Sequence, residues 1–296
     1  MRGETVSVET TDGVGLDGLL VKPAMEGQSR LPIDIVIMHH GVAGRFYRHR
    51  VFDPIMDQVA AQGCAALCVN NRGHDTVFTA EVHGKTRLLG AAYEIVDDCR
   101  YDWDAWIGFA AAQGYRRIGL WGHSLGAVKS IYYLAVQPDP RVACAIASSP
   151  PRQNYENYLA QPDDERGLFE KELAAAEGAV EEGDQERLIQ TTYRRRTIFA
   201  ARTFIDKYGP GSRYDVFQLI PRIQTPLFLT WGGLEPLPSN SSHVSFHELP
   251  AAAARFAADH PNVGFAEIEG ADHGYTGRSS QLWDAAQTWY GSLGVS

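Results

Sequence analysis

Short apolar runs that alternate with longer helix-like stretches are the feature that most constrains the fold of this chain of 296 residues. Apolar runs bounded by turn residues are typical of strands buried on both faces, and strands separated by helices predict a mostly parallel sheet covered by helices. The main strands are assigned to IDIVIMHH (33–40), AALCVNN (65–71), IGLW (118–121), VACAIASS (142–149), PLFLTWGG (226–233) and VGFAEIEG (263–270).

The rest of the chain fits the same layered arrangement. TVSVET (5–10) and GLLVKP (18–23) predict an N-terminal hairpin, because two strand-like runs flank the turn residues TDGVG. Apolar residues at helical spacing predict helices over 50–63, with Gly63 at the C-terminal end, over roughly 91–113 and over 279–293. Counting the hairpin strands, we expect an eight-stranded sheet.

Residues 151–215 interrupt the alternation. They contain charged, alanine-rich stretches and no obvious strand signal. We therefore expect a helical insertion between two strands of a core made of residues 1–150 and 216–296.

Composition excludes several classes of protein. The formal net charge of −9 argues against nucleic acid and against anionic membranes as partners, because both require a basic surface. The four cysteines form no CxxC pair, which argues against a zinc or thioredoxin-like centre. The first residues lack the apolar core of a signal peptide, and no apolar run is of membrane-spanning length. We expect a cytoplasmic protein that acts on a small molecule; the oligomeric state, monomer or homodimer, stays open.

The stretch Gly122-His123-Ser124-Leu125-Gly126 matches G-x-S-x-G and lies between a predicted strand and a predicted helix. That context is the one in which the motif presents a nucleophilic serine on a sharp turn. A glycine-rich turn with an incidental serine is the alternative. The context favours Ser124 as a nucleophile.

These residues resemble the α/β-hydrolase superfamily, and the resemblance extends over nearly the whole chain. The superfamily implies a serine, an acid and a histidine in that order along the sequence. Here the histidine is His273, in the loop after the last strand, with a solvated loop histidine as the alternative. The resemblance also implies a helical cap for residues 151–215, and no metal or organic cofactor.

The acid that the resemblance implies is Glu235, which follows the preceding strand in TWGGLEP. Most members have aspartate there, but glutamate is an accepted triad acid; a surface residue in a turn is the alternative. Asp272 is a weaker candidate, because the side chain of a neighbouring residue rarely points at the same ring nitrogen.

The resemblance also locates the oxyanion hole. One donor is the backbone N–H of Leu125, directly after the nucleophile. The His40-Gly41 pair resembles the superfamily's His-Gly loop, so the second donor is the N–H of Val42, or that of Gly41. In NNRGHD we interpret Arg72 and Gly73 as structural.

Candidate substrate contacts rest on weaker signals. Aromatic residues near the expected pocket suggest an apolar or aromatic substrate, although aromatic residues pack in cores at least as often. One arginine of the run 194–196 could clamp a substrate carboxylate, but arginines paired with nearby carboxylates are the more frequent arrangement. The candidates are Phe46, Tyr47, His123, Tyr155, Tyr158, Arg194, Arg195, Trp231 and Tyr275.

The expected activity is hydrolysis of carboxylic esters through an acyl-enzyme. The same residues could cleave a lactone, an amide or a carbon–carbon bond, or could transfer the acyl group. A non-catalytic binding protein with this fold is the alternative of another class. LLGAAYEIVDDCRYDW (88–103) and YRRRTIFAARTFIDKYGPGSRYD (193–215) are similar to fusarinine-esterase-like hydrolases, from which no substrate is inferred.

Overall fold

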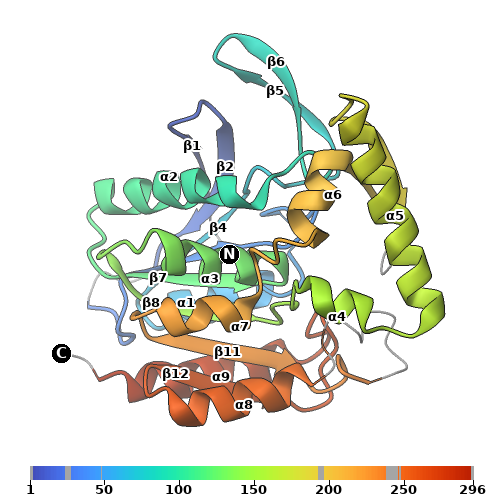
Figure 1. Ribbon diagram of the computed structural model, residues 1–296. Helices are drawn as coiled ribbons and strands as arrows, with labels where there is room; N and C mark the ends of the chain where they lie inside the picture. Colours follow the sequence, from blue (N-terminus) through green and yellow to red (C-terminus); the bar gives the residue numbers. More distant parts are fainter. Residues whose placement is uncertain are drawn as a thin grey trace.

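A central eight-stranded sheet organises the molecule (Figure 1). The computed structural model describes residues 3–23, 28–47, 49–192, 197–237, 246 and 248–294. The strand order is β1-β2-β4-β3-β7-β8-β11-β12. The strands are β1 (Glu4–Glu9), β2 (Gly15–Val21), β3 (Ile35–His39), β4 (Ala65–Val69), β7 (Ile118–His123), β8 (Val142–Ser148), β11 (Leu227–Gly232) and β12 (Val263–Ile268).

The sheet is mostly parallel, as the sequence predicts. Only β2 runs against its neighbours, pairing antiparallel with β1 and with β4. The central strands β3, β4, β7 and β11 are buried along their whole length. Continuous apolar strands of this kind need helices on both faces. Parallel strands also bring their carboxyl ends, and the loops that follow them, to one edge of the sheet.

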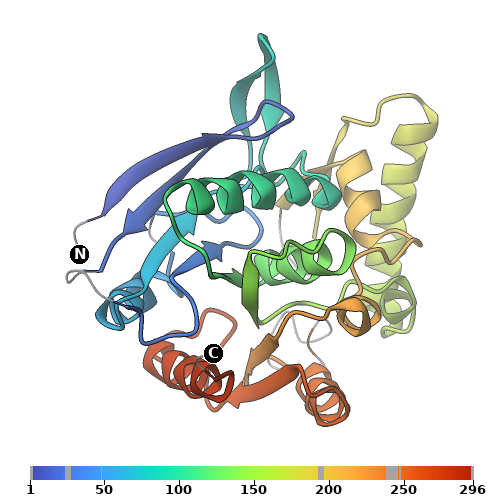
Figure 2. The ribbon, with the colours of Figure 1, turned by 90° about the vertical axis from the view of Figure 1, so that its left-hand side faces the viewer.

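Helices cover the two faces of the sheet (Figure 2). Apolar side chains from one set of helices pack on one face, around Trp103 and Trp106, and those from a second set pack on the other, around Trp121. Burial of each large apolar side chain contributes about 1.5–3 kcal/mol. The first set comprises α2 (Cys99–Ala112), α3 (Leu125–Val136), α7 (Val216–Leu219) and α8 (Leu249–Asp259), with short 3-10 turns η1 (Val96–Asp98) and η2 (Ile220–Arg222); the second comprises α1 (Asp53–Ala61) and α9 (Ser279–Ser292).

The helix predicted from residue 91 begins later. Regular helix starts only at η1 and α2, because the N–H groups of Ala91 and Ala92 bond to the carbonyls of Asp75 and Thr76. Ahead of it lies an unpredicted hairpin, β5 (Phe78–Val82) and β6 (Lys85–Leu89). Its turn, His83-Gly84, has positive φ at both residues, as two-residue hairpin turns require.

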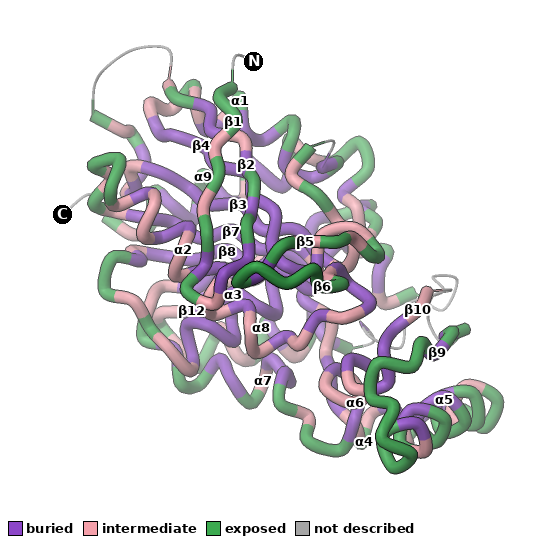
Figure 3. Tube along the Cα trace, turned by 90° about the horizontal axis from the view of Figure 1, so that it is seen from above, coloured by how far each residue is buried: buried purple, intermediate pink, exposed green. Residues whose placement is uncertain are grey.

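Residues 151–215 form a separate group of elements beside the sheet (Figure 3). The helices are α4 (Tyr155–Leu159), α5 (Asp163–Glu181) and α6 (Ala201–Tyr208). The first turn of α5 carries three acidic residues, which stabilise the positive end of the helix dipole. The expectation of helices alone is wrong for this segment, because β9 (Leu188–Thr191) and β10 (Thr197–Ala200) pair antiparallel. Their four residues each are too short to leave a clear alternation in the sequence.

The segment has a hydrophobic cluster of its own, which we call the insertion cluster. It is centred on Phe169, Phe199 and Phe204. Across the ranges that the structure describes, no helix combines the length and apolar character needed to cross a bilayer.

Candidate active site

Ser124 lies on the sharp turn between β7 and α3. Its backbone has φ +57° and ψ −125°, a strained conformation for a residue with a side chain. The flanking glycines make the turn possible. A Cβ at Gly122 would lie 2.3 Å from the carbonyl oxygen of Gly126, and a Cβ at Gly126 would lie 2.1 Å from that of His39. Side chains at either position would collide with the backbone, so the spacing of the motif is a steric requirement.

Three side chains distant in sequence meet at this turn. The Oγ of Ser124 lies 2.9 Å from Nε2 of His273, and Nδ1 of His273 lies 2.7 Å from Oε2 of Glu235. His273 follows β12 and Glu235 follows β11. The carboxyl edge of the parallel sheet therefore brings together the three residues predicted from the sequence.

Hydrogen-bond donors fix the carboxylate of Glu235. The side chain is fully buried. Its Oε1 accepts from the hydroxyl of Ser149 at 2.5 Å and from the N–H of Gly232 at 2.7 Å, which leaves Oε2 for His273. An ionised carboxylate only accepts, so Nδ1 of His273 carries its proton and Nε2 is free to accept one from Ser124.

Ser149 was not predicted. It follows the last residue of β8, at the same sheet edge as Ser124, and this position is the signal that could have indicated it. The single O–H of Ser149 donates to Glu235, so in the 2.9 Å contact with Tyr275 the Ser149 oxygen accepts from the tyrosine hydroxyl. Tyr275 is buried, and its prediction as a substrate contact is wrong: its hydroxyl supports the triad acid.

Asp272 shapes the histidine loop, as the sequence suggests. Its Oδ1 accepts from the N–H groups of Gly274 and Thr276. These bonds lower the pKa of Asp272 against the opposing effect of burial. Its carboxylate is therefore committed to the loop backbone, and Glu235 is the acid bonded to His273.

The loop after β3, residues His40 to Val42, borders Ser124, and we call it the oxyanion loop. A Cβ at Gly41 would lie 2.8 Å from the Cβ of Ser124, so only glycine permits this close approach. The side chain of Val42 packs against both the core and the insertion cluster. On the other side, Leu125 is the first residue of α3, and a first helical N–H has no acceptor within its own helix.

His40 stabilises the oxyanion loop in its neutral form. Its ring Nδ1 lies 2.8 Å from the carbonyl oxygen of Gly41, and its Nε2 accepts from the N–H of Asn71 at 3.4 Å. Burial, assisted by the nearby charge of Lys129, lowers the pKa of His40 to about 3. The ring therefore donates through Nδ1 and accepts through Nε2 at neutral pH.

His123 connects the nucleophile turn to the histidine loop. Its Nε2–H donates to the carbonyl oxygen of His273 at 2.7 Å. Burial lowers the pKa of His123 to about 3, with the neighbouring His273 acting in the same direction. The contact that the structure shows is with the protein backbone, so the His123 ring helps to position the histidine loop, and its contact with a substrate stays a prediction.

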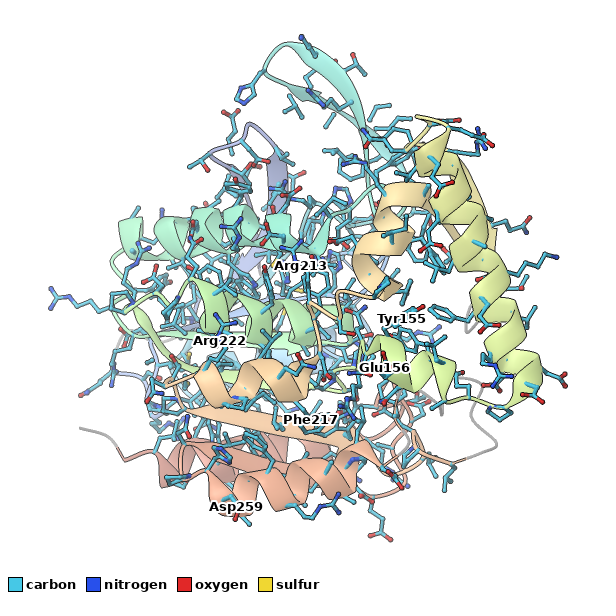
Figure 4. All side chains as sticks on the ribbon, viewed as in Figure 1. Tyr155, Glu156, Arg213, Phe217, Arg222 and Asp259 are labelled. Atoms are coloured by element: carbon cyan, nitrogen blue, oxygen red, sulfur yellow. The ribbon has the colours of Figure 1, made fainter. Side chains whose placement is uncertain are left out.

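The other predicted substrate contacts fall into three groups. Trp231 and Tyr158 are buried, Trp231 in the core and Tyr158 in the insertion cluster; for Trp231 a substrate contact is excluded by its complete burial in β11. Phe46 and Tyr155 are half-buried and Tyr47 is exposed; Tyr155 lies at the start of α4 (Figure 4). Arg194 and Arg195 lie outside the described residues.

Arg72 is structural, as expected. Its guanidinium binds Asp12 and the fully buried Asp102. Among the residues with described positions, no group of three or more His, Cys, Asp or Glu side chains could hold a metal ion.

The fold resembles that of several solved structures. The Pyrococcus furiosus esterase Pf2001 superposes with a TM-score of 0.60 at 18% identity, over 98% of this chain and 91% of that one. Est1E from Butyrivibrio proteoclasticus, bound to ferulic acid, gives 0.65 at 15%, over 96% and 97%. The α/β hydrolase GrgF from Penicillium sp. sh18 gives 0.67 at 14%, over 98% of each chain.

Sequence comparison gives the family directly. No curated protein matches the sequence. The model of the α/β-hydrolase family matches residues 36–285, a range that contains Ser124, Glu235 and His273. With its sheet order, its strained serine turn and this match, the chain belongs to the α/β-hydrolase family.

Proposed function

We propose that the protein is a serine hydrolase that cleaves carboxylic esters of small molecules. The observation that carries this proposal is the continuous hydrogen-bond chain from Ser124 through His273 to Glu235, with heavy-atom distances of 2.9 and 2.7 Å. A serine hydroxyl is a weak nucleophile until an adjacent base removes its proton, and the base needs a third group to orient it. Each of these roles has a side chain in place.

In the first half-reaction, Nε2 of His273 takes the proton of Ser124 as Oγ attacks the ester carbonyl carbon. The N–H groups of Leu125 and Val42 stabilise the oxyanion that develops, and each such donor contributes about 3 kcal/mol to transition-state stabilisation. His273 then protonates the leaving alcohol. The products are an acyl-Ser124 ester and the free alcohol.

In the second half-reaction, water replaces the alcohol. His273 accepts a proton from water, and the hydroxide attacks the acyl carbon. The tetrahedral intermediate collapses, the acid leaves, and His273 returns the proton to Ser124. Glu235 stays ionised and stabilises the imidazolium at both stages.

Residues 151–215 act as a cap in this proposal. The insertion cluster reaches Val42 of the oxyanion loop, so the segment stands beside the reaction centre, where it can exclude water and contact the substrate. The proposed substrate contacts that remain among the described residues are Phe46, Tyr47, His123, Tyr155 and Tyr158. The similarity to fusarinine-esterase-like hydrolases remains a prediction.

Proteins of similar structure support an ester bond over other acyl bonds, because they include the Pyrococcus furiosus esterase Pf2001 and an esterase domain from Rhodothermus marinus. Est1E holds ferulic acid, an aromatic acid, and this makes aromatic acyl groups worth including in a substrate panel.

A panel of nitrophenyl esters graded by acyl length, with methyl ferulate and carboxylated members, tests the proposal. We expect kcat/KM to vary with the acyl group and to fall to background in Ser124→Ala and His273→Ala. Absence of turnover on every ester by folded wild-type protein, or full activity in Ser124→Ala, would refute it. If the folded wild-type protein binds an ester of the panel but hydrolyses none, this would indicate a non-catalytic binding protein with this fold.

A further inference from the structure

Three charged side chains lie buried outside the triad, and we call Lys129, Glu94 and Lys207 the buried charge cluster. The ammonium of Lys129 pairs with Oε1 of Glu94, and that of Lys207 lies 3.3 Å from Oε2. Both lysine side chains are fully inaccessible to solvent, and that of Glu94 is nearly so. Burying ions costs several kcal/mol each unless they are paired and hydrogen-bonded, so the cluster requires an explanation beyond packing.

The cluster joins three parts of the chain. Lys129 lies on α3, one helical turn after Leu125; Glu94 lies in the loop before η1; and Lys207 lies on α6, in the insertion. Although burial opposes it, the charges of Lys129 and Lys207 lower the pKa of Glu94 to about 2. Glu94 is therefore an anion at neutral pH and holds both lysines by charge.

In the contacts that the structure describes, Lys129 is the lysine that bonds to a neighbour of the oxyanion loop, and Lys207 is not. Nζ of Lys129 donates to Oδ1 of Asn71 at 2.9 Å, and the N–H of Gly73 donates to the same oxygen at 2.8 Å. Lys207 donates instead to the carbonyl of Ala91 at 3.3 Å.

The bond from Lys129 determines which way the amide of Asn71 points. An ammonium only donates, so the amide oxygen of Asn71 must face Lys129 and the amide NH₂ must face the other way. There Nδ2 donates to the carbonyl oxygen of His40 at 3.2 Å. This carbonyl belongs to the peptide group that joins His40 to Gly41, and Gly41 lies against Ser124.

We propose that Lys129 is a positioning residue for ester hydrolysis: it orients Asn71, whose amide holds the His40 carbonyl and so fixes the oxyanion loop beside Ser124. The proposal rests on the proposed function. Lys129 touches neither substrate nor reacting atoms in this scheme; Glu94 serves to hold its ammonium in place.

A purely structural role makes a different prediction. Lys207 is as deeply buried as Lys129 and pairs with the same carboxylate, so both should matter equally if the cluster only stabilises the fold. If Lys129 is a positioning residue, losing Lys129 and losing Lys207 should have different effects. Loss of Lys129 should reduce turnover, whereas loss of Lys207 should reduce stability and leave turnover nearly intact.

Lys129→Met and its matched control Lys207→Met give the first comparison. We measure kcat and KM on the best ester of the panel, the melting temperature, and inhibition by a trifluoromethyl ketone, which forms a tetrahedral oxyanion adduct with Ser124. For Lys129→Met we expect kcat and affinity for the ketone to fall by about 10- to 100-fold, less than the loss on deleting a donor outright. KM should change less than about twofold, because ground-state binding does not use the oxyanion hole.

Asn71→Asp provides a second test in case Lys129→Met does not fold. The aspartate keeps an oxygen for Lys129 and balances its charge, but it has no N–H for the His40 carbonyl. We expect the same loss in kcat and in ketone affinity. The melting temperature should fall, because two buried oxygens then face each other, so activity is measured at a temperature at which the variant is fully folded.

The outcomes are decisive. Equal losses of kcat in Lys129→Met and Lys207→Met, or an unchanged kcat in Asn71→Asp, would overturn the positioning role. Both results presuppose an active wild-type enzyme. If the wild type neither hydrolyses esters nor reacts with the ketone, the proposed function itself fails, and this failure is distinguishable from that of the positioning role.

Discussion

Glu235 is surrounded by donors that leave one carboxylate oxygen for His273. Ser149 and the N–H of Gly232 donate hydrogen bonds to Oε1, and the hydroxyl of Tyr275 is hydrogen-bonded to Ser149. The carboxylate can therefore set the tautomer of His273 without moving. The extra methylene of glutamate, compared with the usual aspartate, is accommodated by a turn that bonds back to the carboxylate.

Glu235→Gln should lower kcat about 10⁴-fold, because an amide at this position can no longer hold the proton on Nδ1 of His273. Glu235→Asp keeps a carboxylate and should lose much less. Steady-state kinetics on the best ester gives both values. Equal activities of the two variants would show that charge at this position does not matter.

The buried histidines make stability depend on pH. The pKa of His123 is about 3 in the fold and about 6.5 in an unfolded chain. Between these values the unfolded state binds more protons than the folded state, so stability falls as pH drops below 6.5. From pH 7.5 to 5.0, His123 alone should account for a loss of about 2 kcal/mol.

Urea unfolding of wild type and His123→Gln at the two pH values tests this. The pH-dependent loss should be smaller in the variant by about that amount, because glutamine does not titrate but can still donate to the His273 carbonyl. Identical pH dependence in the two proteins would show that His123 titrates normally.

The sequence motif predicted Ser124, and the order of the family predicted His273 and Glu235. For the supporting residue Ser149 the one signal was its place after a strand end, and Asn71 and Lys129 could not be predicted from a motif or from the order of the family. Their roles depend on which strand ends become neighbours, and a lysine within a helical pattern gives no sign that it points inward.

At the scale of elements, the approach of α3 to β7 and to the oxyanion loop depends on glycine. Gly126 of α3 leaves no room for a Cβ beside the carbonyl of His39, whereas a Cβ at Gly108 of α2 would meet nothing within 4 Å. The same substitution should therefore have opposite effects in the two helices.

Gly126→Ala should destabilise the protein by about 3 kcal/mol, the upper range for overpacking, and Gly108→Ala should stabilise it by about 0.5–1 kcal/mol through helix propensity. Free energies of unfolding from urea titrations provide the comparison. A neutral Gly126→Ala would mean that α3 can move away from the oxyanion loop.

The parallel strands were predictable because each is a continuous apolar run bounded by turns. The β5–β6 hairpin and the β9–β10 pair were not, because their strands have only four or five residues and are partly exposed, which is too short for a clear apolar pattern in the sequence. The charged, alanine-rich composition of the insertion is typical of helices, so it gives no indication of the two strands.

At the scale of the whole molecule, ionic contacts from the C-terminal part of the insertion fasten it to the core. Lys207 pairs with the buried Glu94, and Arg213 pairs with Asp97. The fully buried Asp215 binds Arg152 and Asn154, which joins the two ends of the insertion to each other. Val42 adds an apolar contact between the insertion and the core. We expect the insertion and the core to unfold together.

Two probes test this cooperativity. All six tryptophans lie outside residues 151–215, so tryptophan fluorescence reports on the core alone. A fluorophore on Leu168→Cys, an exposed position of α5, reports on the insertion, and one on Gln287→Cys, exposed on α9, serves as its control. The three transitions should coincide in temperature; an earlier transition at position 168 would show a separately unfolding cap.

A burst experiment tests the central claim most directly. Rapid mixing of the protein with a nitrophenyl ester should release one equivalent of nitrophenol per chain before steady turnover, and mass spectrometry of the quenched protein should place the acyl group on Ser124. Neither signal should appear in Ser124→Ala. An acyl group on another residue, or turnover that survives loss of the Ser124 hydroxyl, would contradict the account.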